Sequence, residues 1–493
     1  MTFEGPRGSG AMKGCFMNAI APLGPTAVPI SPYLGDVCVL GLGATGRAVA
    51  TYLLELGPTR VRSVTVVGGK KSQEGPLAQE LRDAGACVLV GTEDLLGTYD
   101  LAVVSPGISE FSDFFANAKA HAHEVIGEPE FAWRESPERW IGITGTNGKT
   151  TTTSLACELL KSSGIGAVAV GNIGTNVVTQ IAERDPQTWF VAELSSFQLA
   201  TTSKLHPRVA CLLNVTPDHG EWHKTFENYL AAKEKIFANL DEGDLAILDV
   251  DDPHCAALAR QLDDRGLVVC RVSASQIPDS PCRAYVDDGL LVVELIGERY
   301  ELVAVSDLRI EGPHNVANGL AASAAALFAG ASVKGVRQGL KAFAPLEHRI
   351  EPVATIDGVR YINDSKATNT DAVVTALRAF EPGRVILLAG GHDKGGQLDE
   401  FVDAIKASCK ATVTYGEASD RFFEALSGQG LATLLQAPHM AEALTIAKNL
   451  AVPGDVVLLS PACSSYDEFS GFEERGRRFK ELVLTLDLDQ PGH

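Results

Sequence analysis

The chain has 493 residues and a formal net charge of −20, and it is 45% hydrophobic and 21% charged. This composition is typical of a soluble globular protein, and the length indicates roughly three domains rather than one compact core. The negative charge disfavours nucleic acid and anionic membrane surfaces as partners, so an anionic ligand needs a local concentration of Lys and Arg.

The N-terminal segment and the cysteines bear on the cellular compartment. Residues 1–33 are broken by Gly and Pro and lack the continuous apolar centre of a signal peptide, so we expect a loosely ordered extension. The ten cysteines form no Cys-x-x-Cys pair, which predicts a reducing cytoplasm. No apolar run reaches the roughly 20 residues that span a bilayer.

Residues 34–126 are predicted to form a Rossmann-like domain. A buried-strand pattern leads into the glycine loop Gly41 to Gly46 and then into a helical run, the context in which a phosphate lies over a helix N-terminus. An NAD site needs an acid after the second strand, where the chain instead has Gly68-Gly69-Lys70. A different phosphorylated ligand is therefore favoured, and a structural glycine turn that binds nothing is the alternative.

Residues 127–345 are predicted to form a central domain around a second glycine loop at 142–151. Successive backbone N–H groups of such a loop bind a polyphosphate, while Lys149 adds a positive charge and the Thr150 hydroxyl can hold Mg²⁺. The spacing is a variant of the P-loop, because Ile143 stands five positions before Gly148. A glycine turn that happens to end in Lys-Thr is the alternative.

Three further polar positions follow in this domain. Glu193 ends a strand pattern, where an ATP-hydrolysing site needs a Mg²⁺ ligand. His219 lies in a loop dense in His and acids, although each of these alone is often an ordinary polar cap. Lys233 falls on the polar side of a helix and by pattern alone is a solvated lysine. Short β runs at 268–308 predict inserted antiparallel strands, and Asn315 is a candidate helix N-cap.

Residues 346–493 are predicted to form a third, doubly wound α/β domain. Three strand patterns empty into polar loops at 363–369, 390–395 and 460–467. Such loops meet at the carboxyl edge of a parallel sheet, where these folds bind ligands.

Taken in order, these segments resemble the Mur ligases, the ATP-dependent amide-forming enzymes that build the peptide of the bacterial wall precursor. The resemblance runs from about Asp36 to the end of the chain, with the motifs at 145–150, 193–199, 214–219, 314–318, 348–349, 363–369 and 460–476. Within the family, the chain is most similar to the members that add D-glutamate to UDP-N-acetylmuramoyl-L-alanine through an acyl phosphate, in peptidoglycan precursor synthesis.

The resemblance implies a role for each matching position. The catalytic residues would be Lys149, Glu193, His219 and Lys233. ATP would lie on Gly145, Thr146, Asn147, Gly148, Lys149, Thr150, Thr151, Asn318, Arg349 and Asp364. Two Mg²⁺ ions would be held by Thr150, Glu193, His219 and Lys233, the last as a carbamate. The UDP substrate would lie on Gly43, Ala44, Thr45, Gly46, Ser105 and Asn172, and D-glutamate on Lys366, Thr368, Lys394, Ser465 and Phe472.

Two positions depart from the family pattern. Gly68-Gly69-Lys70 replaces an acid and an Arg that help to bind uracil, and Glu221 stands where Asp is usual. Three alternative functions stay open from the sequence: a Mur ligase for another amino acid, a folylpolyglutamate synthase, and a nucleotide-binding switch without ligase activity. We expect a monomer that acts on small molecules in the cytoplasm, without a nucleic acid or membrane partner.

Overall fold

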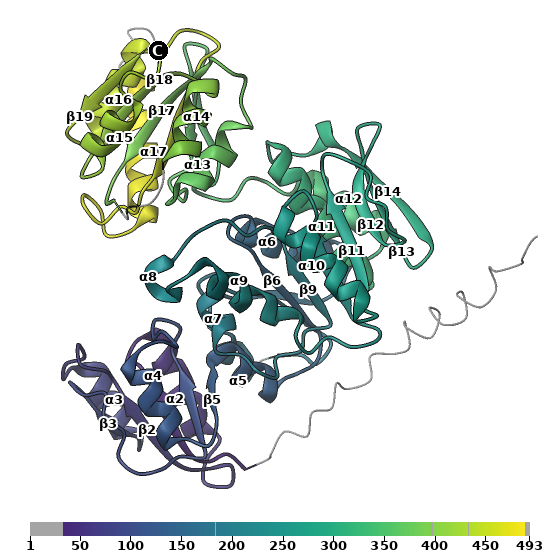
Figure 1. Ribbon diagram of the computed structural model, residues 1–493, viewed down its shortest axis with the longest axis vertical. Helices are drawn as coiled ribbons and strands as arrows, with labels where there is room; N and C mark the ends of the chain where they lie inside the picture. Colours follow the sequence, from purple (N-terminus) through teal and green to yellow (C-terminus); the bar gives the residue numbers. More distant parts are fainter. Residues whose placement is uncertain (1–32, 183, 394, 396–397, 432, 489–493) are drawn as a thin grey trace, which may run out of the picture. The chain divides into compact units, whose positions relative to one another are not determined.

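The computed structural model describes residues 33–488, except 183, 394, 396–397 and 432. The expected N-terminal extension, apart from Tyr33, and Lys394 lie outside the described residues. The chain divides into two compact units (Figure 1). One runs to Val305 and takes in Ala317–Lys341, and the other comprises Ser306–Val316 and the residues from Ala342 onward. Each unit is described by itself below.

The first sheet is a five-stranded parallel sheet in the order β3-β2-β1-β4-β5. Its strands are β1 Gly35–Leu40, β2 Val61–Val67, β3 Cys87–Leu89, β4 Leu101–Val104 and β5 Val125–Gly127. The helices of this part are α2 Ala44–Glu55, α3 Pro76–Asp83, α4 Asp113–His121 and α5 Glu128–Glu135. Four consecutive fully buried residues in β1 and in β4 explain why these strands form the centre of the sheet.

The turn from β1 into α2 depends on a glycine. A Cβ at Gly46 would lie 1.9 Å from the carbonyl oxygen of Gly41, so only glycine lets the helix begin this close to the strand exit. The glycine at position 46 in the sequence motif is therefore sterically required.

The central sheet has nine strands in the order β14-β13-β12-β11-β10-β9-β6-β8-β7. Its strands are β6 Trp140–Thr144, β7 Ala167–Gly171, β8 Trp189–Glu193, β9 Val209–Leu212, β10 Leu245–Asp249, β11 Val268–Ser273, β12 Arg283–Asp287, β13 Leu290–Leu295 and β14 Glu298–Ala304. The ladders are parallel except β12–β13 and β13–β14, which are antiparallel. The predicted antiparallel strands therefore extend the same sheet.

The helices that follow these strands carry most of the predicted site residues of this part. The α-helices are α6 Lys149–Ser162, α7 Ser196–Ala200, α8 Gly220–His223, α9 Phe226–Glu234, α10 Pro253–Asp264, α11 Pro313–Phe328 and α12 Val333–Ala342. Three 3₁₀ turns are η1 Val177–Gln180, η2 Lys235–Phe237 and η3 Val305–Asp307. Helix α11 begins at Pro313, so Asn315 lies inside it and the N-cap prediction was wrong.

The third sheet has six strands in the order β15-β16-β20-β17-β18-β19. Its strands are β15 Glu351–Ile356, β16 Val359–Asn363, β17 Val385–Gly390, β18 Cys409–Tyr415, β19 Leu434–Ala437 and β20 Val456–Ala462, with only β15 antiparallel to its neighbour. Its helices are α13 Thr370–Leu377, α14 Asp399–Ser408, α15 Ser419–Leu426, α16 Met440–Leu450 and α17 Phe472–Leu488.

Both faces of the third sheet are buried, as the alternation along β17 shows. Leu387 packs in a cluster with Phe401 of α14 and Phe422 of α15, whereas Leu388 packs in a second cluster with Met440 of α16 and Phe479 of α17. A parallel sheet covered by helices on both sides is the doubly wound arrangement. The predicted α/β fold class is confirmed.

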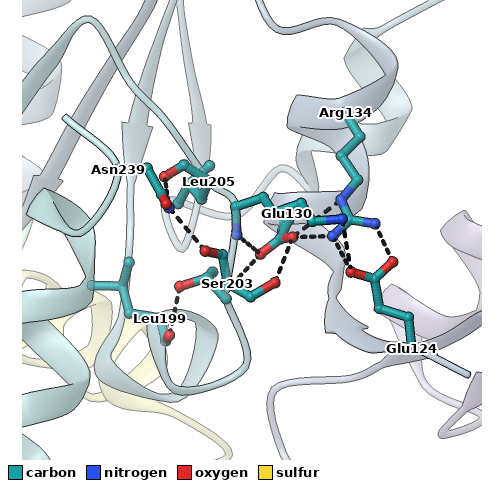
Figure 2. A network of polar contacts seen from close by, with 9 residues as sticks. Glu124, Glu130, Arg134, Leu199, Ser203, Leu205 and Asn239 are labelled. Carbon is teal, nitrogen blue, oxygen red and sulfur yellow. Dashed lines mark hydrogen bonds and ion pairs between the residues drawn. The ribbon is translucent and has the colours of Figure 1, made fainter. Parts of the chain in front are cut away.

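A buried polar network joins the edge of the first sheet to the central sheet (Figure 2). Glu130 of α5 is fully buried and accepts hydrogen bonds from Arg134 Nε at 3.1 Å, from the backbone N–H of Lys204 at 3.1 Å and from that of Ser203. Arg134 also donates to both oxygens of Glu124, at 2.6 Å each. Because a buried charge is stable only when fully paired, this network fixes α5 to the turn at 203–204.

The described helices and cysteines give two further observations. None of the described helices is long and apolar enough to cross a membrane. The cysteines within the described residues are all free thiols, and most are buried. The expected reducing compartment stays a prediction.

Candidate functional site

The loop at 145–148 links β6 to α6 and carries Lys149 at its end. Gly145 has φ 157° and Gly148 has φ 82°, and a Cβ at Gly148 would lie 2.5 Å from Asn318 Oδ1. Glycine is thus required where the loop turns into the helix. Lys149 Nζ donates to the carbonyl oxygens of Gly145 and Thr146, at 2.7 Å each. The ammonium group therefore lies against the loop that is predicted to bind phosphates.

Residues of α9 and of the segment that follows β9 hold the same loop in place. The amide N–H of Asn147 donates to Asn214 Oδ1 at 2.8 Å. Thr146 Oγ1 lies 2.8 Å from the hydroxyl of Tyr229 and accepts from the N–H of Thr216 at 3.0 Å. Tyr229 has no role that was predicted from the sequence. A polar residue one turn before Lys233 is the only signal that could have suggested one.

Glu193 ends β8 beside the strand that leads into the loop. The register pairs Ile143 of β6 with Glu193, and the carboxylate is almost fully buried. Its Oε1 accepts from Asn172 Nδ2 at 2.9 Å, while its Oε2 has no hydrogen-bond partner within the described residues. Buried carboxylate oxygens normally have a binding partner, and Mg²⁺ is a cation that binds such oxygens.

Lys233 is buried, so its interpretation as a solvated lysine was wrong. Its side chain is 1% exposed, and Nζ donates to the carbonyl oxygen of Gly145 at 2.7 Å and lies 4.6 Å from the centre of the Tyr229 ring. Burial lowers the pKa of the Lys233 amine well below its usual value, and the charge of Lys149 lowers it further. The neutral amine, which is the form that reacts with CO₂, is therefore favoured.

His219 lies at the start of the short helix α8 in a left-handed conformation, φ 54°. Its backbone N–H donates to Asp218 Oδ1 at 2.8 Å, and its ring stands 4.6 Å from that of Phe197. About 43% of its side chain is exposed, so the imidazole can reach a ligand. Burial lowers the pKa of the neighbouring His223 to about 4.

Asn318 of α11 is the other predicted nucleotide contact in this unit. It is almost fully buried, and its Oδ1 accepts from Thr152 Oγ1 of α6 at 3.1 Å. Thr150 and Thr151 are buried in the first turn of α6. The structure therefore brings the loop, Asn318 and Lys233 together within one unit.

The predicted UDP loop lies at the carboxyl edge of the first sheet. Thr45 Oγ1 donates to Asn176 Oδ1 at 3.2 Å, which links this loop to the segment that carries Asn172. The backbone N–H of Ser105 donates to the carbonyl oxygen of Leu40 at 3.0 Å. Its side-chain Oγ is buried and has no hydrogen-bond partner in the described part of the chain. Lys70, in the departing segment, forms an ion pair with Glu93 at 2.7 Å.

Asp364 and Arg349 belong to the other unit. The Asp364 carboxylate accepts from Ser460 Oγ at 2.7 Å and from the N–H of Ile350 at 3.2 Å. His348 and Ile350, on either side of Arg349, both have positive φ, at 64° and 42°. Such strain in non-glycine residues persists only where neighbouring contacts enforce it, and it is common at ligand sites.

The predicted D-glutamate residues that are described also lie in this unit. Lys366 Nζ is 5.2 Å from the centre of the Phe472 ring, Ser465 is buried and Thr368 is half-buried. Lys394 lies outside the described residues. Arg475, for which the sequence predicts no role, is fully buried and donates to the carbonyl oxygens of residues 365, 463 and 464 at 2.9, 3.0 and 3.3 Å. Arg475 therefore links the polar loop at 363–369 to the polar loop at 460–467.

We expect the titration of Asp364 to make the apo-protein less stable as pH rises. Burial raises the pKa of this carboxyl from 3.8 to about 7, against the lowering effect of the Ser460 hydroxyl. The folded state then binds more protons than the unfolded state between these values, so its stability falls by about 3 kcal/mol from pH 5 to pH 8. Thermal unfolding of Asp364→Asn should show that this loss is removed.

The matched control is Asp399→Asn, at the exposed start of α14. Its melting temperature should follow that of the wild type at both pH values. A constant difference between Asp364→Asn and the wild type at pH 5 and pH 8 would contradict the prediction.

Family models match three consecutive stretches of the chain. The N-terminal domain of the MurD-like Mur ligases matches residues 35–127, the Mur ligase middle domain 143–326, and the Mur ligase glutamate ligase domain 348–463. Two similar proteins are the UDP-N-acetylmuramoylalanine–D-glutamate ligases of Pelotomaculum thermopropionicum and Geobacillus kaustophilus, at 39% and 40% identity. Each match covers 91% of this chain and 97% of the relative.

Solved structures share the fold at low sequence identity. A pseudomurein peptide ligase type C from Methanothermus fervidus has a TM-score of 0.57 at 18% identity and covers 92% of this chain and 100% of that one. The UDP-N-acetylmuramate-alanine ligase MurC from Thermotoga maritima has a TM-score of 0.56 at 19% identity, with coverage of 92% and 99%.

Proposed function

This chain belongs to the Mur ligase family, and we propose that it joins D-glutamate to UDP-N-acetylmuramoyl-L-alanine at the expense of ATP, in peptidoglycan precursor synthesis. The observation that carries the proposal is the match to D-glutamate ligases over 91% of the chain and 97% of each relative. The buried Lys233 amine, bonded to a carbonyl of the phosphate loop, supports it from the geometry.

ATP would lie on the loop from Gly145 to Thr151. Backbone N–H groups at the start of α6 and the ammonium of Lys149 would bind its phosphates. Asn318 would contact the adenine. Arg349 would contact the phosphates, and Asp364 the ribose.

Two Mg²⁺ ions fit the donor set that this chain offers. The unsatisfied Oε2 of Glu193 and the Thr150 hydroxyl suit one ion, and His219 suits the second. Lys233 cannot bind a cation as an amine, but its carbamate would add a carboxylate, and the lowered pKa of the amine favours that reaction. Bound Mg²⁺ would offset negative charge between the two anionic reactants.

The remaining residues would bind and orient the two other substrates. The UDP group would lie on the loop at 43–46, with Ser105 and Asn172 placing the rest of the precursor. Lys366 and Lys394 would face the two carboxylates of D-glutamate, with Thr368, Ser465 and Phe472 lining the same site.

The reaction would proceed in two displacements. A carboxylate oxygen of UDP-N-acetylmuramoyl-L-alanine attacks the γ-phosphorus of ATP, and ADP leaves. The D-glutamate amine, after losing one proton, attacks the acyl phosphate carbon; the C–O bond to phosphate breaks, and the nitrogen loses a second proton as the amide forms. Lys149 would stabilise the charge that develops on the transferred phosphoryl group. We further propose that the enzyme acts as a cytoplasmic monomer.

An omission experiment tests this function. Phosphate release should require ATP, UDP-N-acetylmuramoyl-L-alanine and D-glutamate together. ATP and the precursor form the acyl phosphate, and phosphate leaves it when the D-glutamate amine attacks. ATP hydrolysis at the same rate without the precursor or the amino acid would instead indicate a nucleotide-binding switch, and would contradict the proposal.

A further inference from the structure

The helix α8 is too short to hold its own direction. It has four residues, Gly220–His223, and lies between His219 and Lys224, which both have a positive φ, at 54° and 69°. A single helical turn has no appreciable stability of its own in water. The direction of α8, and of His219 at its start, must therefore come from contacts with the rest of the fold.

His223 provides a buried contact from α8 to the segment after β8. Its side chain is fully buried, and Nε2 lies 2.9 Å from the hydroxyl oxygen of Ser196. Ser196 is the first residue of α7, three positions after Glu193. The backbone N–H of His223 donates to the carbonyl of His219 at 3.1 Å, and its own carbonyl accepts from Asn228 Nδ2 at 2.9 Å.

Aromatic packing surrounds this hydrogen bond. The Trp222 ring stacks on Phe197 with centres 4.7 Å apart and planes at 21°, and the His219 ring stands against the same Phe197 at 4.6 Å. Ser109 Oγ also donates to the carbonyl of Trp222 at 2.9 Å. These ring contacts are apolar and tolerate sliding, whereas the hydrogen bond between His223 and Ser196 is directional and restrains α8 against α7.

A buried histidine at this position carries a cost. His223 Nδ1 has no hydrogen-bond partner among the residues that the structure describes, and leaving a buried polar atom unsatisfied destabilises the folded state. A phenylalanine would fill a similar space without this cost but could not bond to Ser196. The cost is consistent with a role in setting geometry rather than in adding stability.

We infer that His223 is a positioning residue, which fixes α8 against α7 and thereby sets the direction of His219 relative to Glu193. The inference rests on the proposed function, in which His219 and Glu193 are metal ligands. It adds a residue that touches neither metal nor substrate but determines how well the two ligand-bearing segments are aligned. Residues that orient metal ligands commonly change metal affinity by about 10- to 100-fold when replaced.

The test measures Mn²⁺ binding by electron paramagnetic resonance, with ADP present, in the full-length protein. His223→Phe keeps the ring and removes the bond, so Mn²⁺ affinity should fall by about 10-fold or more. Ser196→Ala removes the other partner and should have a similar effect, and the double variant should be no weaker than either single one. His223→Gln can place an amide nitrogen near Ser196 and should stay close to the wild type.

Arg134→Gln is the control for a purely structural effect. Arg134 Nε donates at 3.1 Å to the fully buried Glu130, in the network that fixes α5 to the turn at 203–204. This variant should lower the melting temperature but leave Mn²⁺ affinity unchanged. The inference is overturned if His223→Phe and Ser196→Ala bind Mn²⁺ like the wild type, whatever their melting temperatures, or if Arg134→Gln weakens binding equally.

A further variant separates this inference from the proposed function. His219→Ala should itself weaken Mn²⁺ binding. If it does so and the His223 and Ser196 variants do not, only the positioning role fails. If His219→Ala binds Mn²⁺ like the wild type, the proposed metal role of His219 fails, and the inference fails with it.

Discussion

Replacing Lys233 by alanine is expected to lower turnover roughly a thousand-fold, the scale on which loss of one charge-stabilising group acts in a closed site. The amine is 1% exposed and bonds to the carbonyl of Gly145, so its loss affects the phosphate loop directly. Its carbamate would also be lost, and with it one proposed carboxylate ligand. Steady-state phosphate release with saturating substrates measures the effect.

A second readout separates the carbamate from the amine. Wild-type protein equilibrated with ¹³C-bicarbonate should show a carbamate carbon by nuclear magnetic resonance, and Lys233→Ala should not. Lys235→Ala is the matched control, since Lys235 is half-buried two positions further along and donates to the carbonyl of Ala200. Near wild-type turnover in Lys233→Ala would exclude the proposed role.

Replacing Lys149 by alanine should reduce kcat about 10²- to 10³-fold, because a positive charge is removed from the phosphate loop at the point where charge develops. The KM for D-glutamate should change much less, since the residues proposed to bind that substrate lie in the other unit. Initial rates over a range of ATP and D-glutamate concentrations give both parameters.

Lys161→Ala tests whether any lysine of α6 has this effect. Lys161 lies in the last turn of the same helix and is exposed, so its removal should leave kcat unchanged. Equal losses in the two variants would show that the Lys149 effect is general helix destabilisation and would contradict the prediction.

The two glycine loops could be predicted because each is a continuous segment with its own steric logic. At Gly46 and Gly148 a side chain would collide with neighbouring atoms, and these constraints leave a local trace in the sequence. The same holds for the continuous apolar run that forms β17, whose two faces pack in separate clusters. Fold class and loop positions therefore followed from short-range patterns.

The burial of charged groups could not be predicted in this way. Lys233 lies on a helix whose local pattern makes it a surface residue, yet the loop at Gly145 and the ring of Tyr229 cover it. Arg475 likewise sits in a run of charged residues but is fully buried and bonds to three backbone carbonyls. Both depend on contacts between segments far apart in the chain, which a single sequence does not record.

His223 shows the same limit at the site itself. The sequence singled out a loop dense in His and acids, and the resemblance assigned a role to His219 alone. The hydrogen bond between His223 of α8 and Ser196 of α7 joins residues 27 positions apart, and only the structure reveals it.

The amino-acid specificity is tested most directly by phosphate release with ATP and UDP-N-acetylmuramoyl-L-alanine, compared across D-glutamate, L-glutamate, L-lysine and meso-diaminopimelate. We expect rapid release with D-glutamate, together with a product heavier than the precursor by one glutamyl residue, and little release with the other three. Equal turnover with L-glutamate, or none with D-glutamate, would contradict it.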